Sequence, residues 1–285
     1  MAGRARRTAR IRAAAVTYAN LVPFLFFALF PFYFMFVTSF KSNAELYNLK
    51  AIPFWIQTGA ITAHYTFLFM RTDFLTWIKN SLIVSVVATG VSLAIAILAG
   101  YSLARLRYRG VSSFGTAVFV TYLVPPTLLF LPLSQVVVWL GISDSIWALI
   151  VTYPTFLVPF STWLLMGYFR TVPREIEECA LVDGASRMQT LVRIVLPTAV
   201  PGIVCAALFG FTLCWNEFIY ALTFVSQTAS KTAVVGVTAD LIRGDIYYWG
   251  SLMAGAVLAS LPIVIVYVWF LDYYVSGLTA GAVKG

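Results

Sequence analysis

The sequence predicts an all-α protein that crosses a membrane six times. Of its 285 residues, 61% are apolar and only 11% are charged, and its mean hydropathy is +0.88. Soluble domains carry about 25% charged residues. Six stretches without a charge are long enough for a bilayer-spanning helix, which takes about 20 residues. So few charges could not cover the surface of a soluble domain of this size, and the composition therefore excludes a soluble enzyme and a disordered chain.

The predicted spans are six charge-free stretches separated by more polar loops. The third, with 34 residues, is too long for one straight span, and it contains Pro125, Pro126 and Pro132. Proline removes a backbone donor, so we expect a kink or break there, facing other helices or water rather than lipid. The stretches are Ala13 to Phe40, Asn80 to Ala104, Gly110 to Ser143, Ser145 to Phe169, Ile194 to Asn216, and Ile246 to Leu271.

The distribution of basic residues predicts the orientation of the chain. Thirteen Lys and Arg residues fall in the N-terminal tail, two of the loops and the C-terminal tail, and six fall on the other side. By the positive-inside rule both termini are cytoplasmic. We expect an Arg-rich tail at 1–12, one transmembrane domain at 13–275 and a C-terminal tail at 276–285. The net charge of +8 then indicates attraction to anionic lipid rather than binding to nucleic acid. An uncleaved membrane span directly follows the Arg-rich start.

The sequence offers no metal, disulfide or phosphate-binding motif. Cys179, Cys205 and Cys214 lack CxxC spacing, and the single histidine, His64, is expected to be an exposed loop residue. The dipeptide Gly-Lys does not occur, so the chain does not hydrolyse ATP through a GxxxxGK[ST] loop.

The loop Arg170–Arg193 predicts a short helix, a glycine turn and a second helix. Pro173 suits the first position of the first helix, and Ile176, Cys179 and Ala180 form a narrow apolar stripe. Gly184 is expected to end this helix in a left-handed conformation. Three acidic residues lie near the positive end of the helix dipole, where they stabilise the helix: Glu175, Glu177 and Glu178.

The second helix of this loop is predicted to begin after Ser186. Ser186 to Gln189 fits a capping box, and the helix is expected to run on into the fifth span. From the residues alone two interpretations remain open. The loop is either an amphipathic connector on the membrane surface or a docking element for a partner.

The spacing within this loop resembles the E-A-A motif of the membrane subunits of ABC importers. Glu178-Cys179-Ala180 is followed after three residues by Gly184 and after nine more by Ile194, with Leu196-Pro197 beyond. Cys179 stands where the motif has its first alanine, a small residue for a small one. Two further segments, Trp215–Phe218 and the C-terminal Gly277–Gly285, resemble the smaller membrane subunit of carbohydrate importers of the maltose-transporter type.

The resemblance implies the type I ABC importer permease fold in a prokaryotic inner membrane. It implies a second homologous permease subunit, two cytoplasmic ATPase subunits and an extracytoplasmic sugar-binding protein as partners. ATP and Mg would bind to the ATPases, so this chain would be non-catalytic and hold no cofactor. The residues expected to couple to the ATPases are Glu177, Glu178, Cys179, Ala180, Asp183, Gly184, Ala185, Ile194, Leu196 and Pro197. The tail residues expected to contact the ATPases are Gly281, Ala282, Val283, Lys284 and Gly285. The alternative interpretation of the tail is a frayed terminus.

Polar residues within the predicted spans are candidates for a substrate cavity, because polar groups are costly in a bilayer. They are Tyr122, Gln135, Tyr153 and Asn216. Each could instead hydrogen-bond a neighbouring helix. The spans hold no Lys, Arg, Asp or Glu, which favours a neutral or weakly polar carbohydrate. Alternatives are an importer for a polyol or glycerol phosphate ester, a stand-alone secondary transporter or channel, and an intramembrane enzyme.

Overall fold

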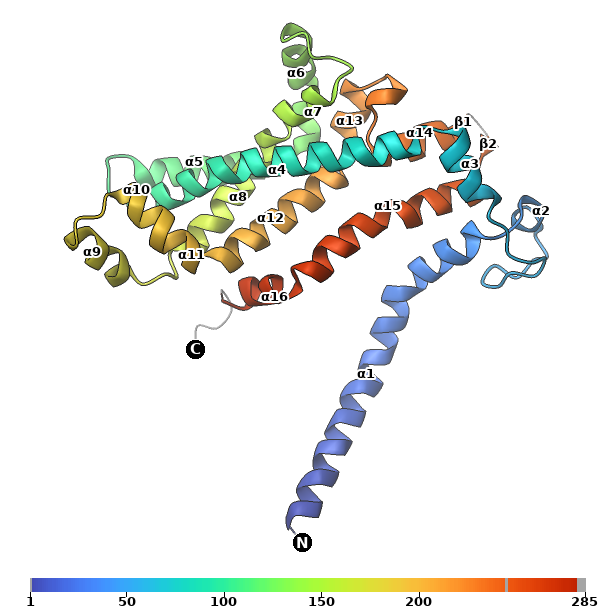
Figure 1. The fold of residues 1–285 in the computed structure, drawn as a ribbon, viewed down its shortest axis with the longest axis horizontal. Helices are drawn as coiled ribbons and strands as arrows, with labels where there is room; N and C mark the ends of the chain where they lie inside the picture. Colours follow the sequence, from blue (N-terminus) through green and yellow to red (C-terminus); the bar gives the residue numbers. More distant parts are fainter. Residues whose placement is uncertain (1, 244–245, 281–285) are drawn as a thin grey trace. The chain divides into compact units, whose positions relative to one another are not determined.

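The computed structural model describes residues 2–243 and 246–280 and is almost entirely helical (Figure 1). This confirms the predicted all-α class. Within the described residues, the exception is a short antiparallel ladder that joins β1 (Ile242–Arg243) to β2 (Ile246–Tyr247). Internal contacts divide the chain into two compact units, residues 1–72 with 241–258 and residues 73–240 with 259–285. The single domain at 13–275 stays a prediction.

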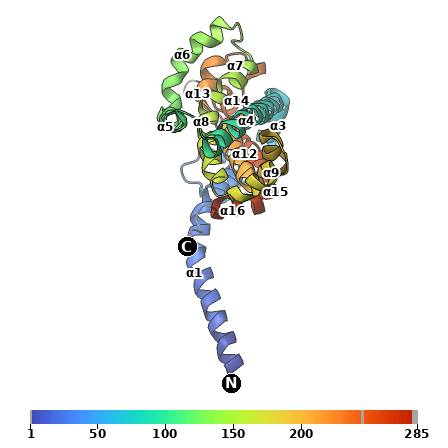
Figure 2. The same cartoon turned by 90° about the vertical axis from the view of Figure 1, so that its left-hand side faces the viewer.

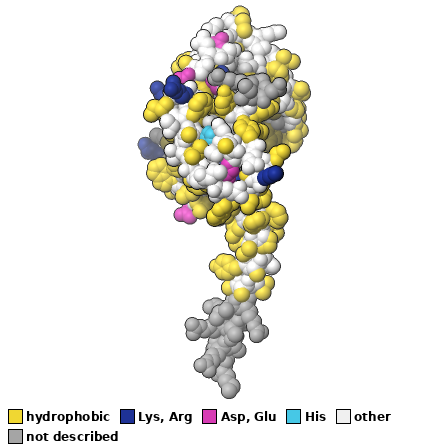
Figure 3. All heavy atoms as spheres, turned by 90° about the vertical axis from the view of Figure 1, so that its right-hand side faces the viewer, with side chains coloured by type: hydrophobic (Ala, Val, Ile, Leu, Met, Phe, Trp, Pro, Cys, Tyr) yellow, Lys and Arg dark blue, Asp and Glu magenta, His cyan; other side chains and the backbone are white. Residues whose placement is uncertain are grey.

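The first unit is built on the long helix α1 (Ala2–Ser39), followed by α2 (Asn43–Leu46) and α3 (Ala63–Arg71). It also includes the first turns of α15 (Trp249–Trp269). Residues Ala14–Ser39 of α1 are long and apolar enough to cross a membrane. Large apolar side chains, drawn in yellow in Figure 3, are exposed along α1. That distribution suits a span whose sides face lipid or other membrane helices.

His64 lies in the first unit, and the prediction that it is an exposed loop residue is wrong. It belongs to α3 and is only 6% exposed. Its Nε2 lies 2.9 Å from the carbonyl oxygen of Lys41, and its Nδ1 lies 3.3 Å from Oγ of Ser251. Both ring nitrogens therefore have the polar partners that a buried imidazole needs. These partners are 23 and 187 residues away, beyond the reach of a local pattern.

Three helices form the centre of the second unit: α4 (Phe74–Arg105), α8 (Pro154–Phe169) and α12 (Val200–Trp215). α4 packs along α8 and against α12, and α16 (Leu271–Ala280) also packs on α12. One apolar cluster includes Val84, Ala88, Leu149, Leu157 and Phe224. A second includes Ala96, Leu165, Phe169, Leu191 and Val195, so the end of the Arg170–Arg193 loop packs on the helical core.

The long third stretch is broken as predicted, but by two of its three prolines. α5 (Val111–Leu123) and α6 (Pro126–Trp139) meet at 95° (Figure 2). Val124 and Pro125 each precede a proline, and both adopt extended backbone conformations, as steric contact with the following ring requires. Pro132 lies inside α6 and does not end it.

The fifth span differs from the prediction of one continuous helix. The chain forms α10 (Arg187–Thr190), a π-helical turn (Leu191–Val195) and α11 (Leu196–Thr198), and the axis then turns by 79° before α12. Pro201, near the start of α12, has no N–H to continue the helical ladder across this point. The straight part of the span therefore begins at Val200, not at Ile194.

The remaining elements complete the membrane-spanning set. α7 (Ile146–Thr152) and α8 together form one candidate span, and α15 forms another, which starts at Trp249 because Ile246–Tyr247 belong to β2. Short elements join α12 to β1: α13 (Ile219–Phe224), a 3-10 turn (Thr228–Ser230) and α14 (Ala233–Leu241). In the described residues four helices can span a membrane, or six spans exist when each bent pair counts as one, which matches the predicted number.

Candidate functional site

The loop between the fourth and fifth spans has the predicted helix–turn–helix form. Its first helix, α9 (Arg174–Val182), begins one residue later than predicted, so that Pro173 is the N-cap. Gly184 has a φ of +89°, and its N–H donates to the carbonyl of Leu181 at 3.1 Å. The N–H of Ala185 donates to the carbonyl of Ala180 at 3.0 Å. This pair of bonds is a Schellman motif, which requires the left-handed conformation that glycine adopts without strain.

The capping box at the start of α10 is also present, which confirms the prediction. The N–H of Gln189 donates to Oγ of Ser186 at 3.3 Å, and the N–H of Ser186 donates to Oε1 of Gln189 at 2.8 Å. Each helix of the loop therefore ends or begins on a defined local motif. Backbone hydrogen bonds hold the Gly184 turn between them.

The burial of α9 differs from the predicted apolar stripe. Ala180 is buried, but Ile176 and Cys179 are exposed, and the second buried residue of the helix is Glu177. The side chains on either side of the turn face outward, with Val182 86% exposed and Met188 58% exposed. Glu178 and Asp183 are exposed as well. The free face of the loop is thus partly apolar and partly charged.

Glu177 is buried because it is paired with the end of α4. Its Oε1 lies 2.6 Å from Nε of Arg105, in the geometry of an ion pair rather than of an aligned hydrogen bond. Its Oε2 accepts from the hydroxyl of Tyr101 at 3.2 Å. A terminal nitrogen of Arg105 also donates to the carbonyl of Val172, just before α9. Three polar contacts therefore join α4 to the loop at one point.

The last predicted coupling residues lie where the loop enters the membrane core. Ile194 belongs to the π-helical turn and is half-buried, as is Leu196 at the start of α11, whereas Pro197 is exposed. Leu196 packs on the cluster that holds Leu191 and Val195. The predicted tail contacts, Gly281 to Gly285, lie outside the described residues.

The four candidates for substrate contact do not form one site. Tyr122 lines a cavity of about 490 Å³ at the break between α5 and α6, together with residues of α8 and α12 such as Phe160 and Phe209. Its ring centroid lies 5.7 Å from that of Phe160. Gln135 is exposed on α6. Asn216 is exposed too, and its Nδ2 donates to the carbonyl of Thr212, one turn back on its own helix.

Tyr153 is fully buried, and its contacts favour the alternative of a hydrogen bond within the protein. Its hydroxyl donates to Oε2 of Glu217 at 2.9 Å. The same carboxylate accepts from the backbone N–H groups of Tyr220 at 2.8 Å and Ala221 at 3.0 Å, and so caps α13. Glu217 was not among the predicted site residues, although it belongs to Trp215–Phe218, the segment that resembles the carbohydrate importer subunit. In the described residues no three His, Cys, Asp or Glu side chains gather as a metal site would require.

The candidate spans, two of them bent, are the features of a multi-pass integral membrane protein. Residues 93–279 match the family described as binding-protein-dependent transport system inner membrane component, and the chain belongs to this family. It is thus a multi-pass inner membrane permease subunit of an ABC importer. The family description makes a binding protein one partner of such a system, and the ABC class makes an ATPase another.

Relatives and a solved structure cover nearly the whole chain. It is 37% identical over 270 residues to the inner membrane ABC transporter permease protein YcjP of Escherichia coli, covering 94% of this chain and 95% of that protein. It is 35% identical to the diacetylchitobiose uptake system permease protein DasC of Streptomyces coelicolor, covering 90% and 92%. A chain of a bacterial ABC transporter that imports alginate has a TM-score of 0.75 at 22% identity, covering 94% and 98%, which shows the fold.

Proposed function

We propose that the chain is one membrane half of an ATP-driven sugar importer, and that a second, homologous permease subunit completes the translocation pathway. Relatives support the solute class, since DasC is named for diacetylchitobiose and the 33% identical MalG of Thermococcus litoralis for trehalose/maltose. The absence of charged residues from the predicted spans supports it as well, because hydroxyl-rich solutes need only neutral hydrogen-bonding partners.

In this proposal the loop containing α9 docks into a cleft of the dimer formed by the two cytoplasmic ATPase subunits. The observation that carries it is the combination of a rigid local fold and an uncovered outer face. The Gly184 turn and the Ser186 cap fix the backbone, while Val182 and Met188 remain exposed. Exposed apolar side chains on an otherwise polar loop are typical of a partner-binding surface. The excess of Lys and Arg on this side of the membrane supports a cytoplasmic location for the loop and for both termini.

The Arg105–Glu177 pair gives the docked loop a mechanical connection to the membrane. ATP binding closes the ATPases, and the movement of α9 is passed to α4 through the ion pair and the Tyr101 hydroxyl. Because α4 packs along α8 and α12, the helices move together. The result is alternating access through a rigid-body change between two states. The chain itself performs no catalysis; ATP and Mg bind to the ATPases.

The pathway side of the proposal centres on the cavity at the α5–α6 break. A proline break frees backbone carbonyls, which are tolerated at membrane depth where they line a water-filled cavity. Tyr122 lies there with Thr121 and Thr155, which supports its assignment to the pathway. Gln135 and Asn216 remain candidates because their side chains are exposed. For Tyr153, the buried bond to Glu217 favours a role in packing.

The experiment reconstitutes the full transporter and measures ATP hydrolysis stimulated by binding protein loaded with different solutes. Stimulation by a neutral mono- or oligosaccharide is expected. Stimulation by a polyol or a glycerol derivative alone would favour the alternative importer, for which a 33% identical relative named for sulfoquinovosyl glycerol transport gives some support. Stimulation only by an amino acid, a peptide or a metal ion would reject the sugar assignment.

A further inference from the structure

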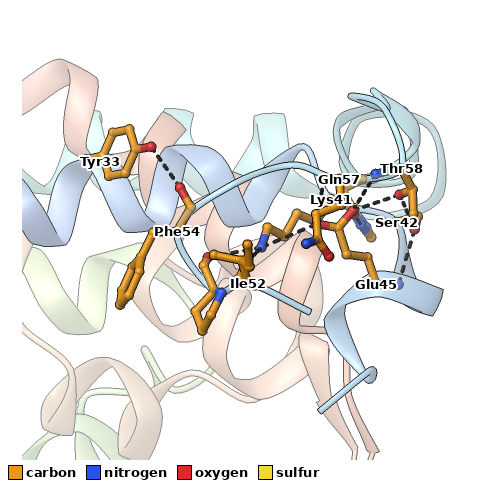
Figure 4. Close-up of polar contacts among 10 residues, drawn as sticks. Tyr33, Lys41, Ser42, Glu45, Ile52, Phe54, Gln57 and Thr58 are labelled. Atoms are coloured by element: carbon orange, nitrogen blue, oxygen red, sulfur yellow. Dashed lines mark hydrogen bonds and ion pairs between the residues drawn. The ribbon is translucent and has the colours of Figure 1, made fainter. Parts of the chain in front are cut away.

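The segment after α1 folds back along the helix from which it came. α1 ends at Ser39, and α2 follows, yet Phe54 returns to lie against α1 (Figure 4). Its ring centroid is 5.4 Å from that of Phe30 and 6.3 Å from that of Phe34. The hydroxyl of Tyr33, between these two, donates to the carbonyl of Phe54 at 2.8 Å.

The contacts with α1 set the depth of Phe54 in the bilayer. Phe30 precedes the end of the helix at Ser39 by nine residues, which corresponds to about 14 Å at the rise of an α-helix. The charge-free part of α1 begins after Arg12. A hydrocarbon core takes up about 20 helical residues from that point and ends near Tyr33. Phe54 therefore lies at the outer boundary of the hydrocarbon, not in the water beyond it.

The backbone carbonyls of this segment have the partners that carbonyls at membrane depth require. Three successive carbonyls accept hydrogen bonds from side chains. Nζ of Lys41 donates to the carbonyls of Ile52 at 2.7 Å and Pro53 at 3.0 Å, and Tyr33 donates to the third, that of Phe54. Pro53 has no N–H to satisfy. Unsatisfied peptide groups are costly in hydrocarbon, whereas carbonyls that face water need no side-chain partners.

The charge of Lys41 is balanced within the same fold. Its ammonium lies 3.4 Å from Oε1 of Glu45, and both side chains are almost fully buried. The Glu45 carboxylate also accepts from the N–H of Gln57 at 3.0 Å, and from the N–H at 3.1 Å and the hydroxyl at 2.7 Å of Thr58. The Lys41–Glu45 pair thus closes the segment as a neutral clasp, and it presents no net charge to its surroundings.

The side chains that this arrangement leaves exposed are of the kinds found at a bilayer interface. Ile52 is 51% exposed, Phe54 47% and Trp55 65%. Aromatic residues, and Trp above all, concentrate where hydrocarbon meets the headgroups. We propose that residues 51–55 form an interfacial anchor that sits in the outer leaflet of the bilayer and fixes the outer end of α1 at that depth. This anchor is independent of the transported solute and of the ATPase contact.

The test measures the depth of a nitroxide spin label by collision with oxygen, which partitions into the bilayer, and with a water-soluble nickel chelate. The label is attached to Trp55→Cys in a chain whose three native cysteines are replaced by alanine, within the whole transporter in lipid nanodiscs. The control is Ala44→Cys, on the exposed surface of α2 beside Glu45, beyond the end of α1.

The expected result is a collision rate with oxygen several-fold above that with nickel at position 55, and the reverse at position 44. A nickel-accessible label at position 55 would place the segment in water and overturn the anchor. A label there that neither reagent reaches would show that the second permease subunit covers the segment, and would overturn the lipid assignment as well.

A second variant tests whether the clasp holds the anchor. Lys41→Met removes the donor to Ile52 and Pro53, and the oxygen preference at position 55 should fall toward the value at position 44. The milder Glu45→Gln keeps a hydrogen-bonding side chain and should shift it less. An oxygen preference that is unchanged in Lys41→Met would contradict the role given to the clasp.

Discussion

Arg105 at the end of α4 and Glu177 in the first turn of α9 form an ion pair with 2.6 Å between Nε and Oε1, and their side chains are only 5% and 9% exposed. The pair joins a membrane-spanning helix to the exposed loop that follows the fourth span. A buried pair is weak evidence for stability by itself, but removing one partner leaves a charge without compensation. Substitution of either residue is therefore expected to weaken the contact between α9 and α4.

Replacing Arg105 by methionine should lower the thermal stability of the purified permease and uncouple ATP hydrolysis from uptake. Loss of one partner of a buried pair costs about 3–5 kcal/mol. The double variant Arg105→Met, Glu177→Met should recover part of the stability but not the coupling. The matched control is Arg107→Met, because Arg107 lies two residues further along the chain and is exposed. If Arg105→Met and Arg107→Met behave alike in both assays, the pair does not connect the loop to α4.

Gly184→Trp should leave membrane insertion intact but reduce the amount of ATPase that copurifies with the permease. The substitution strains a position with a φ of +89° and adds a large side chain to the proposed docking face. Gly59→Trp is the control, since Gly59 has a φ of +93° and equally open surroundings in the first unit. Equal retention of the ATPase by both variants would remove the docking role from the Gly184 turn.

Deleting Gly281 to Gly285 should weaken coupling without unfolding the protein. The described part of α16 ends at Ala280, so the deletion spares the helix that packs on α12. Uptake and stimulated ATP hydrolysis should both fall, while the melting temperature stays within about a degree of the wild type, as expected for a change outside the core. Wild-type transport by the truncated chain would show that the tail is a frayed terminus.

The Glu45 carboxylate should make the stability of the segment after α1 depend on pH. Burial raises the pKa of its carboxyl, but hydrogen bonds from Thr58 and Gln57 and the contact with Lys41 outweigh this and lower it from 4.5 to about 2. The folded state therefore favours the ionised form, and this contribution is fully present above pH 4.5 and is lost as the pH falls towards 2.

The measurement compares the melting temperatures of the wild type and Glu45→Gln between pH 7 and pH 3. The wild type should be the more stable at pH 7, and the difference should narrow below pH 4.5. The same comparison with Glu175→Gln, an exposed carboxylate at the start of α9, serves as control. A difference that does not change with pH would contradict the assignment.

The sequence predicted the features that depend on neighbouring residues. The Gly184 turn and the Ser186 cap are local motifs, and the Pro125–Pro126 break follows from steric contact between adjacent residues. Three features escaped prediction because their partners are distant along the chain. Arg105 meets Glu177, His64 meets Ser251, and Tyr153 meets Glu217 only after the helices pack. The 79° turn before α12 lies within a continuous apolar run, which predicts a straight span, and Pro201 is a local signal against that straight span.

The accessibility of Cys179 tests the central claim, that the ATPases cover the loop containing α9, most directly. Cys179 is exposed on α9, whereas Cys205 and Cys214 are buried, so the natural chain already carries a reporter thiol. Cys179→Ser identifies its signal in maleimide labelling. We expect rapid labelling of Cys179 in the permease without its ATPase and strong protection in the assembled transporter. Equal labelling of Cys179 in the two preparations would contradict it.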